Sequence, residues 1–327
     1  KKQGWGNTMR GIFQDAEGTI YAKCESENKL IYKKANGIID TLQLKLDAQT
    51  LDEFKYTASF YVLDETKKNV FTLGTSLHKI NLQNGAVKSY DQFIPYTTAK
   101  GQNPLIKLKD GRLLFGQRLS QLVLFDPVTE QSEPIFKDVK IENDLADFFY
   151  FKQSKNDNII WIGTQSSGLL KINLNGSISK TYSLKTNPSI SKNFVFVVEE
   201  DAVGGLWVGT YGGGLNYISS DGETVKKYTT AHGLPDNNVA GILTDKDENL
   251  WISTYNGLSF FPRDTEIFQN FYAEDGLSNN EFNYSSFFKD SNGVFYFGGM
   301  NGLNTFTSSA VSTKAPPPKM RFTSFSG

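Results

Sequence analysis

Hydrophobic and polar residues alternate along most of the chain in short runs, and clusters of Gly, Asn, Asp and Ser separate these runs. Segments such as GLNYIS, VKKYTT and FQNFYA show the alternation, and Val, Ile, Tyr, Phe and Trp are frequent in them. Period-2 alternation with β-branched and aromatic residues favours strands over helices. The pattern therefore predicts an all-β protein, and we identify no helix.

The predicted strands belong to a repeated unit. WIGTQSSGLLKI from Trp161 aligns without a gap with WVGTYGGGLNYI from Trp207, and then with WISTYNGLSFF from Trp251. Extending this register gives one aromatic or apolar anchor in each unit, at intervals of 43 to 50 residues: Tyr21, Phe71, Leu114, Trp161, Trp207, Trp251 and Tyr296. Seven such units fill the chain.

Each unit has the content of four strands. In four units an aspartate lies six residues before the anchor: Asp15, Asp201, Asp245 and Asp290. This gives a strand, a tight Asp-x-x-Gly or Asp-x-x-Asn turn, a strand with the anchor, a Gly-rich turn and two more strands. Four strands in 40 to 50 residues are typical of a β-propeller blade. The sequence predicts a seven-bladed β-propeller of four-stranded antiparallel blades over residues 1–312.

The repeated side chains have structural roles in this interpretation. Trp161, Trp207 and Trp251 are expected to pack between adjacent blades, because buried aromatic rings dominate core energetics. The repeated aspartates are expected to accept backbone hydrogen bonds within their own turns.

The repeat resembles a known family. The core at Leu206–Leu215, echoed at Leu250–Leu258, resembles the two-component regulator propeller repeat, and Gly276–Phe306 is similar to the last propeller repeat in periplasmic sensor regions of hybrid two-component histidine kinases. Residues 313–327 then resemble the linker and first strand of the β-sandwich that follows. The resemblance implies a periplasmic, non-enzymatic sensor that binds an oligosaccharide, forms a homodimer through the full-length sensor, and meets the membrane and kinase only through segments absent here.

The start of the chain leaves one strand unassigned. KKQGWGN aligns with the loop AHGLPDNN, so the outermost strand that should precede it is missing. Two hypotheses follow for blade seven: either the tail KMRFTSF supplies its fourth strand, or residues before Lys1 do. An open strand edge is an aggregation liability, which is why closure matters.

A candidate site follows from the antiparallel order. The loop before the first strand of a blade and the loop between its second and third strands emerge on the same face. These loops place Tyr, Asn, Gln, Ser, Trp and Gly around one channel mouth, where rings stack on sugar faces and amides bind hydroxyls. The predicted ligand-binding residues are Trp5, Arg118, Gln165, Tyr211, Asn237, Tyr255, Asn280, Glu281 and Asn301.

Composition argues against several other functions. The 34 basic and 35 acidic residues are scattered and nearly balanced, which disfavours a nucleic-acid surface. Cys24 is the single cysteine and His78 and His232 are the two histidines, so we expect no metal, no cofactor and no catalytic triad. The TYGGGL segment lacks the Lys-Ser/Thr and helix of a phosphate loop.

Two other functions remain open at this point. Propellers also dock proteins, and a flat apolar patch would indicate such a scaffold. A propeller lyase or glycoside hydrolase would require two convergent carboxylates with shifted pKa values near the channel mouth.

Overall fold

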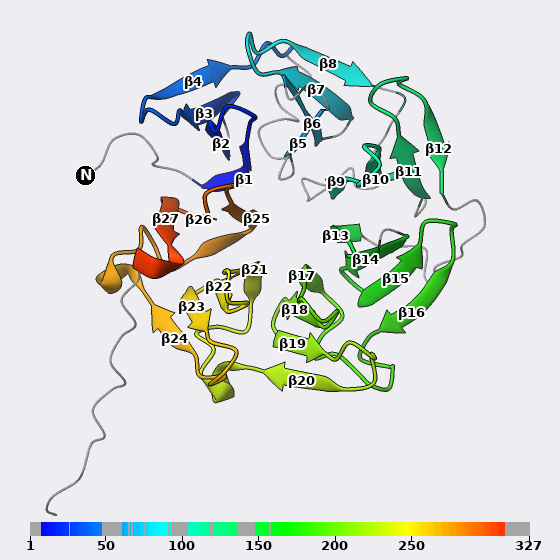
Figure 1. Cartoon of the computed structure of the whole chain (residues 1–327), viewed down its shortest axis with the longest axis vertical. Helices are drawn as coiled ribbons and strands as arrows, with labels where there is room; N and C mark the ends of the chain where they lie inside the picture. The colour runs from blue at the N-terminus through cyan, green and yellow to red at the C-terminus, as the bar shows by residue number, and fades with distance from the viewer. Residues whose placement is uncertain are drawn as a thin grey trace, which may run out of the picture.

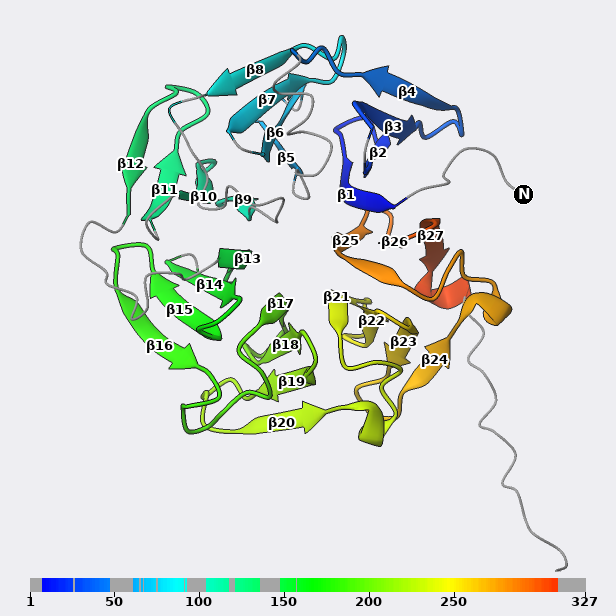
Figure 2. The same cartoon turned by 180° about the vertical axis from the view of Figure 1, so that it is seen from behind.

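The computed structural model of the chain describes residues 8–25, 27–47, 61–64, 66, 68–74, 76–90, 92, 104–117, 121–135, 148–156 and 158–310. Within them, seven antiparallel sheets stand in a ring around a central channel, which confirms the predicted propeller (Figure 1; Figure 2 shows the opposite face). We number the sheets as blades 1 to 7 in chain order, and in each blade the strands follow one another from the channel to the rim.

The strands have these bounds. The innermost strands are β1 (Met9–Gln14), β5 (Tyr61–Leu63), β9 (Leu105–Lys107), β13 (Phe148–Gln153), β17 (Val195–Glu200), β21 (Val239–Thr244) and β25 (Phe282–Lys289). The second strands are β2 (Ile20–Cys24), β6 (Asn69–Leu73), β10 (Leu113–Gln117), β14 (Ile159–Thr164), β18 (Leu206–Thr210), β22 (Leu250–Thr254) and β26 (Val294–Gly299). The third strands are β3 (Lys29–Lys33), β7 (Leu77–Asn81), β11 (Gln121–Phe125), β15 (Leu169–Asn173), β19 (Gly214–Ile218), β23 (Gly257–Phe261) and β27 (Gly302–Thr307). The rim strands are β4 (Ile39–Gln43), β8 (Val87–Tyr90), β12 (Ser132–Pro134), β16 (Ile178–Tyr182), β20 (Val225–Tyr228) and β24 (Gln269–Phe271).

Helical structure in the described residues is confined to three single 3₁₀ turns, η1 (Thr230–His232), η2 (Ala273–Asp275) and η3 (Ser308–Ala310). The first two follow the rim strands of blades 5 and 6, before the chain returns to the channel. None of the helices in this part of the chain has the length and apolar character that a membrane span requires.

The repeated aspartates act as predicted. The carboxylate of Asp201 accepts hydrogen bonds from the backbone N–H groups of Val203 and Gly205, at 3.1 and 2.7 Å. Asp15, Asp245 and Asp290 accept the corresponding pairs in their own turns. These turns join the first and second strands of a blade on the face opposite the predicted mouth.

The anchor tryptophans are buried in the packing between blades. Trp207 and Trp251 are 1% and 2% exposed, respectively. The Trp207 ring lies 5.7 Å from Phe261 of blade 6, and the Trp251 ring lies 4.6 Å from Phe306 of blade 7. The glycine two residues after an anchor permits the close approach of the next blade. A Cβ on Gly163, for example, would lie 2.8 Å from the backbone oxygen of Val195.

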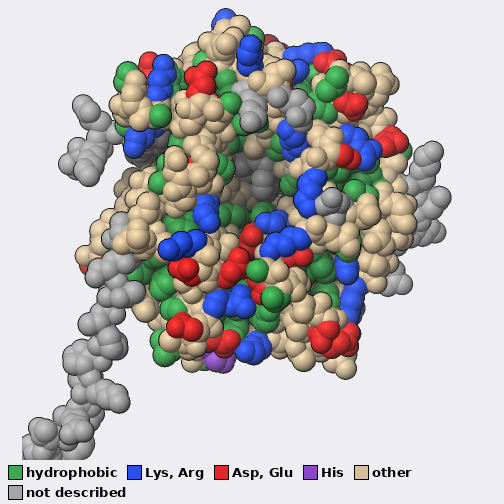
Figure 3. Space-filling view, in the orientation of Figure 1, with side chains coloured by type: hydrophobic (Ala, Val, Ile, Leu, Met, Phe, Trp, Pro, Cys, Tyr) green, Lys and Arg blue, Asp and Glu red, His purple; other side chains and the backbone are tan. Residues whose placement is uncertain are grey.

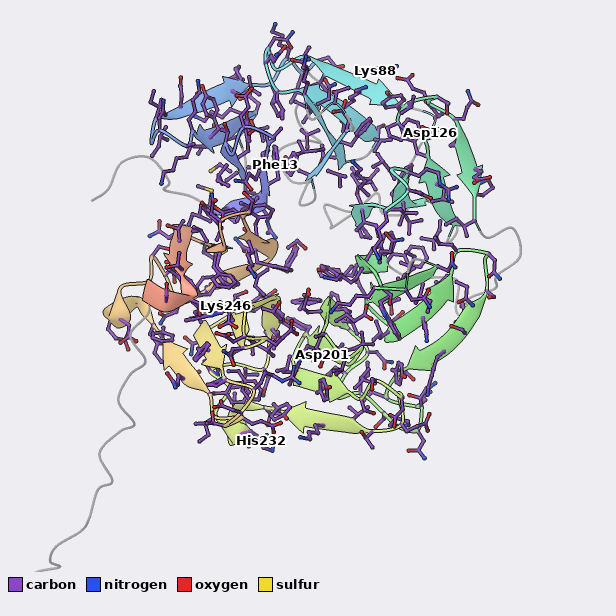
Figure 4. The ribbon with its side chains drawn as sticks, viewed as in Figure 1. Phe13, Lys88, Asp126, Asp201, His232 and Lys246 are labelled. Carbon is purple, nitrogen blue, oxygen red and sulfur yellow. The ribbon has the colours of Figure 1, made fainter. Side chains whose placement is uncertain are left out.

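In several blades a Lys-x-Tyr pair on the rim strand forms hydrogen bonds to the next blade. In blade 5, Lys226 and Tyr228 donate to the carboxylate of Glu266 in the β23–β24 turn of blade 6, at 3.1 and 2.9 Å. Lys88 and Tyr90 of blade 2 bind Glu130 of blade 3 in the same way. Figure 4 shows Lys88 at the rim where these two blades meet. Blade 4 repeats the tie, with Gly222 and Glu223 as acceptors.

Blade 7 is three-stranded in the described part of the chain and closes the ring against blade 1. Asn283 of β25 donates to the carbonyl of Met9, and Gln14 accepts a bond from the backbone of Ser291, both at 3.0 Å. After β27 the chain enters η3, where the Ser308 hydroxyl donates to Asp245 of blade 6. Residues 311–327 lie outside the described residues, so the origin of a fourth strand and the predicted linker both remain predictions.

Candidate functional site

The predicted channel mouth forms where two kinds of loop meet. In blade 5 the N–H of Tyr211 donates to the carbonyl of Phe194, just before β17, at 2.9 Å. Tyr255 pairs with Asn238 in blade 6 at 3.2 Å, and Met300 pairs with Glu281 in blade 7 at 3.0 Å. The loop between the second and third strands therefore lies beside the loop that enters the blade, as the antiparallel order predicts.

The second strand ends at the mouth in a repeated turn. The hydroxyl of Thr210 donates to the carbonyl of Gly214 at 2.9 Å, and Thr164 and Thr254 close the same turn in blades 4 and 6. The next residue, four positions after each anchor, then projects from the start of the turn. We call this the mouth position, and its described members are Glu25, Gln165, Tyr211, Tyr255 and Met300.

The innermost strands contribute further aromatic rings through β-bulges. In β13 and β17 the pairing with the second strand skips one residue, which is Phe149 in blade 4 and Phe196 in blade 5. Such bulges change the direction in which a side chain points. Phe149 stacks on Phe196 with ring centroids 4.8 Å apart, and it lies 5.3 Å from Tyr284 of blade 7. Rings from blades 4, 5 and 7 therefore meet at the channel.

This aromatic cluster continues to the mouth position. Tyr211 lies 5.4 Å from Phe196 and 6.1 Å from Tyr255, the last in a T-shaped arrangement. Tyr211 is 47% exposed, whereas Tyr255 is half-buried. Burial raises the pKa of the Tyr255 hydroxyl, and the neighbouring Tyr284 and Tyr211 raise it further while Arg10 opposes the change. The hydroxyl therefore stays protonated at neutral pH and can donate a hydrogen bond.

The other predicted residues divide into two groups. Gln165, Glu281 and Asn301 lie in mouth loops with half-buried or exposed side chains. The side-chain oxygens of Asn237 and Asn280 instead accept backbone hydrogen bonds seven residues back, from Thr230 and Ala273, at 3.0 and 2.6 Å.

These two asparagines thus hold the entry loops of blades 6 and 7 in shape, which is the ordinary turn role of Asn. Trp5 and Arg118 lie outside the described residues, and their predicted roles remain predictions.

Sequence reasoning missed Arg10 and Glu25. Arg10 extends from β1, and its guanidinium lies 4.4 Å above the ring centroid of Tyr284. Its Nε lies 3.4 Å from a carboxylate oxygen of Glu25, and the two side chains are 18% and 27% exposed. Glu25 occupies the mouth position, so the repeat register contained a signal for it. Arg10 has no counterpart in the other units, so the repeat contained none.

Both histidines take part in local hydrogen bonds. His78 is buried and bonds Ser89, and His232 lies at the rim in η1, where its Nδ1 contacts the backbone and hydroxyl of Thr229 (Figure 4). In the described residues no three His, Cys, Asp or Glu side chains are grouped as metal ligands.

The carboxylates with lowered pKa values in the described residues lie in turns on the face opposite the mouth. Burial alone would raise these pKa values, but the hydrogen bonds that the carboxylates accept lower them by more. They are Asp64, Asp110, Asp126, Glu130, Asp201, Asp221 and Glu266.

Two hollows open on the face opposite the mouth. One of about 550 Å³ adjoins Arg263 in blade 6, and one of about 320 Å³ is lined by Phe13, Tyr61, Lys107 and Phe288. The Arg263 guanidinium is already engaged, because it binds Asp201 at 3.3 Å and lies 5.0 Å above the Trp207 ring. Of the predicted site residues that the structure describes, none lines either hollow.

Comparison with known families bears on the nature of the repeat. Residues 233–256 match the family described as "Two component regulator propeller". The match lies within one unit of the repeat. It is also similar to Histidine kinase P4 of Formosa agariphila, with 28% identity over 242 residues that make up 58% of this chain and 17% of the kinase. The two-component resemblance predicted from the residues is thereby confirmed.

Solved structures share the fold. The extracellular domain of a putative hybrid two component system from B. thetaiotaomicron superposes with a TM-score of 0.66 and 17% identity, over 96% of this chain and 42% of that one. A virginiamycin B lyase from Staphylococcus aureus superposes with a TM-score of 0.68 and 12% identity, over 91% of this chain and 94% of the lyase. At these identities the structural similarities show the fold alone.

This chain spans less than half of the length of the two-component proteins that it matches.

Proposed function

We propose that this propeller is the extracytoplasmic, ligand-sensing part of a two-component sensor kinase, and that its ligand is an oligosaccharide bound at the channel mouth. The observation that carries the proposal is a group of three rings that are not buried, Tyr211, Tyr255 and Tyr284, which come from blades 5, 6 and 7 and pack on the buried Phe196. Aromatic faces bind the apolar faces of sugar rings, and phenol hydroxyls and amides bind sugar hydroxyls. The two-component repeat and the kinase relative support a sensory role.

The site supports binding better than catalysis. Both histidines are engaged in local structure, and the turn carboxylates with lowered pKa values lie on the opposite face. A lyase that shares the fold at 12% identity does not transfer its activity. In the full-length protein, ligand occupancy would change kinase output only by binding one arrangement of the sensor more tightly than another. A homodimer and a periplasmic location complete the proposal.

A protein-docking scaffold has less support. On the face seen in Figure 3, apolar side chains are interspersed with charged ones of both signs. Apart from the adjacent Ile38 and Ile39 of blade 1, the described large apolar side chains with more than half of their surface exposed come from separate blades. They are Val128, Leu184, Val203 and Ile267. Single exposed apolar residues are normal on soluble proteins and do not indicate an interface.

A thermal-shift screen tests the proposed function. The panel contains cellohexaose, mannohexaose, xylohexaose, laminarihexaose, hexaglucuronate and hexamannuronate. A ligand that binds only the native state raises the unfolding midpoint by mass action. We expect at least one sugar to raise it, and we expect Tyr211→Ala and Tyr255→Ala to abolish the ligand-induced rise.

The control is Ile267→Ala, which removes an exposed apolar side chain on the opposite face. It should leave the ligand-induced rise unchanged. A panel without any rise, or a rise that survives both tyrosine substitutions, would contradict the proposed function or its location.

A further inference from the structure

Arg10 enters the mouth with its hydrogen-bonding capacity only partly used. Its Nε lies 3.4 Å from Glu25, which is longer than a well-formed N–H···O bond. Its Nη1 is buried and has no hydrogen-bond partner within the described residues. A guanidinium presents five N–H donors in a planar fork, and a buried donor without an acceptor is unfavourable. An acceptor oxygen from a ligand would therefore improve this site.

The surroundings hold the guanidinium in place. Its Cζ lies over the Tyr284 ring, 4.4 Å from the centroid, in a cation–π contact. Gly11, the extra residue of the β1 bulge, has a φ of 40°, a conformation that glycine adopts without strain. Stacking and bulge together hold Arg10 at the junction of blades 1 and 7, next to the aromatic cluster.

The charges of the described residues around Arg10 are nearly balanced. The Glu25 carboxylate contacts the guanidinium. Glu281 and Arg10 both act on the pKa of Tyr255, which the negative charge of Glu281 raises and the positive charge of Arg10 lowers. Lys23 pairs with Arg10 in the β1–β2 register, but its buried ammonium donates to the carbonyl of Cys24. Two carboxylates thus offset the cationic groups of this corner. Balanced donors and acceptors beside aromatic rings suit an uncharged polyol better than an anion.

We propose that Arg10 and Glu25 form the polar subsite of the mouth and bind two neighbouring hydroxyl groups of a neutral sugar ring. The Arg10 N–H groups donate to the two hydroxyl oxygens, and the Glu25 carboxylate accepts from one of the hydroxyl groups. The rings of Tyr211, Tyr255 and Tyr284 then contact the apolar face of the same or the next sugar. This inference rests on the proposed function, and it adds the residues and the ligand charge that determine specificity.

The position of the subsite has a further effect. Arg10 belongs to the first blade, whereas Tyr284 belongs to the last, and the cation–π contact between them crosses the closure of the ring. A sugar that binds both groups bridges this closure. Ligand binding is therefore expected to slow hydrogen exchange in β1 and β25 more than in β9.

Two pairs of sugars test the inference by isothermal titration of the 327-residue chain. Cellohexaose and hexaglucuronate differ only in oxidation at C6, and so do mannohexaose and hexamannuronate. The wild-type chain should prefer the neutral member of the pair that it binds. Arg10→Met should weaken that binding by about tenfold to a hundredfold, the effect of losing hydrogen bonds to a charged group. Arg10→Lys retains the charge but not the fork, and Glu25→Gln removes the charged acceptor, so both should weaken binding by at least about tenfold.

The control is Arg112→Met, which makes the same substitution at an arginine of the β9–β10 turn, on the face opposite the mouth, where it pairs with Asp110 and Glu133. It should leave the affinity unchanged. The unfolding midpoint without sugar checks the fold of each variant, and Glu25→Gln replaces Arg10→Met if the latter fails to fold.

The outcomes separate this inference from the proposed function. If Tyr211→Ala abolishes binding but Arg10→Met does not change it, the subsite is overturned and the function stands. If the uronate of a pair binds more tightly than its neutral counterpart, the neutral-sugar assignment is overturned and the function stands. If no sugar binds the wild-type chain, the proposed function and this inference both fail.

Discussion

Lys23 occupies a position where four other blades have glycine. It lies two residues after the anchor Tyr21, and the equivalent residues include Gly163 and Gly209, where the next blade approaches closely. Lys23 is 1% exposed, and its ammonium donates to the carbonyl of Cys24 at 2.6 Å. Burial lowers its pKa to about 8, although Cys24, Glu25 and Glu27 act in the opposite direction.

This shift predicts a pH dependence of stability. The folded pKa of about 8 lies below the unfolded value of about 10.4, so between these pH values the unfolded chain binds more protons. The free energy of unfolding should therefore rise by about 2 kcal/mol as the pH increases from 7.5 to 9.5, at about 1.4 kcal/mol per pKa unit. Urea unfolding measures the slope. Lys23→Met should remove the rise, and the exposed Lys33→Met should retain it; equal slopes in both variants would contradict the assignment.

At the residue scale the sequence predicted roles that depend on local chemistry. The turn aspartates such as Asp201 were predictable because Asp binds backbone N–H groups a few residues ahead of it. The location of Tyr211 and Tyr255 at the mouth was predictable from the antiparallel order. Arg10 was not predictable, because its position depends on a bulge and on contact with a strand more than 270 residues away.

At the scale of elements, the rim strands do more than complete their own sheets. The Lys-x-Tyr pair of β20 reaches Glu266, and that of β8 reaches Glu130. Both glutamates have left-handed backbone conformations, with φ values of 51° and 57°. This conformation is unfavourable for side chains with a Cβ, so the turns hold these residues there while the carboxylates bind the preceding blade.

Substitutions of Glu266 separate the contribution of its hydrogen bonds to blade 5 from the cost of its left-handed backbone conformation. Glu266→Gly loses the ties to Lys226 and Tyr228 but relieves the backbone, whereas Glu266→Ala loses the ties and retains the strain. We expect both to destabilise the chain and Ala to be worse than Gly by about 1 kcal/mol, the cost of a left-handed non-glycine residue. Urea unfolding measures the difference. Equal stability of the two variants would show that the backbone strain is absent.

The sequence could not predict these ties. The period of the strands locates β8 and β20, but it does not indicate which turn of the next blade a rim side chain will reach. That contact depends on the stagger between blades, which arises from packing of the whole ring.

At the scale of the whole molecule, the fold was predictable from the seven repeated units of the sequence. Each blade buries its faces only against its neighbours, so the number of repeats indicated the number of blades. The closure of the ring was less predictable. Blade 7 has three strands in the described part of the chain, and contacts such as that of Asn283 with Met9 join it to blade 1.

The carboxylates that hold the ring together predict loss of stability in acid. Asp201 and Glu266 have lowered pKa values, because hydrogen bonds from Tyr217, Lys226 and Tyr228 outweigh the effect of burial. Their contribution is present above the unfolded pKa values of about 4 and is lost as the pH falls through the lower folded values. The free energy of unfolding should therefore decrease between pH 5 and pH 3.

Urea unfolding at several pH values tests this expectation. The double substitution Asp201→Asn and Glu266→Gln should reduce stability at pH 7 and flatten the acid dependence. Stability that is unchanged between pH 5 and pH 3 would contradict a role for these ion pairs in holding the ring together.

The distribution of the anchor tryptophans determines what intrinsic fluorescence can detect. Trp161, Trp207 and Trp251 are at most 7% exposed, belong to blades 4, 5 and 6, and have indole N–H groups without a partner in the described structure. With Trp5 replaced by Phe, emission therefore comes from one side of the ring only. Blades 1, 2 and 3 could separate without a shift in the wavelength of tryptophan emission, whereas circular dichroism would detect the loss of their strands. An emission curve that lags behind the dichroism curve on heating would mean that the ring opens first on its tryptophan-free side.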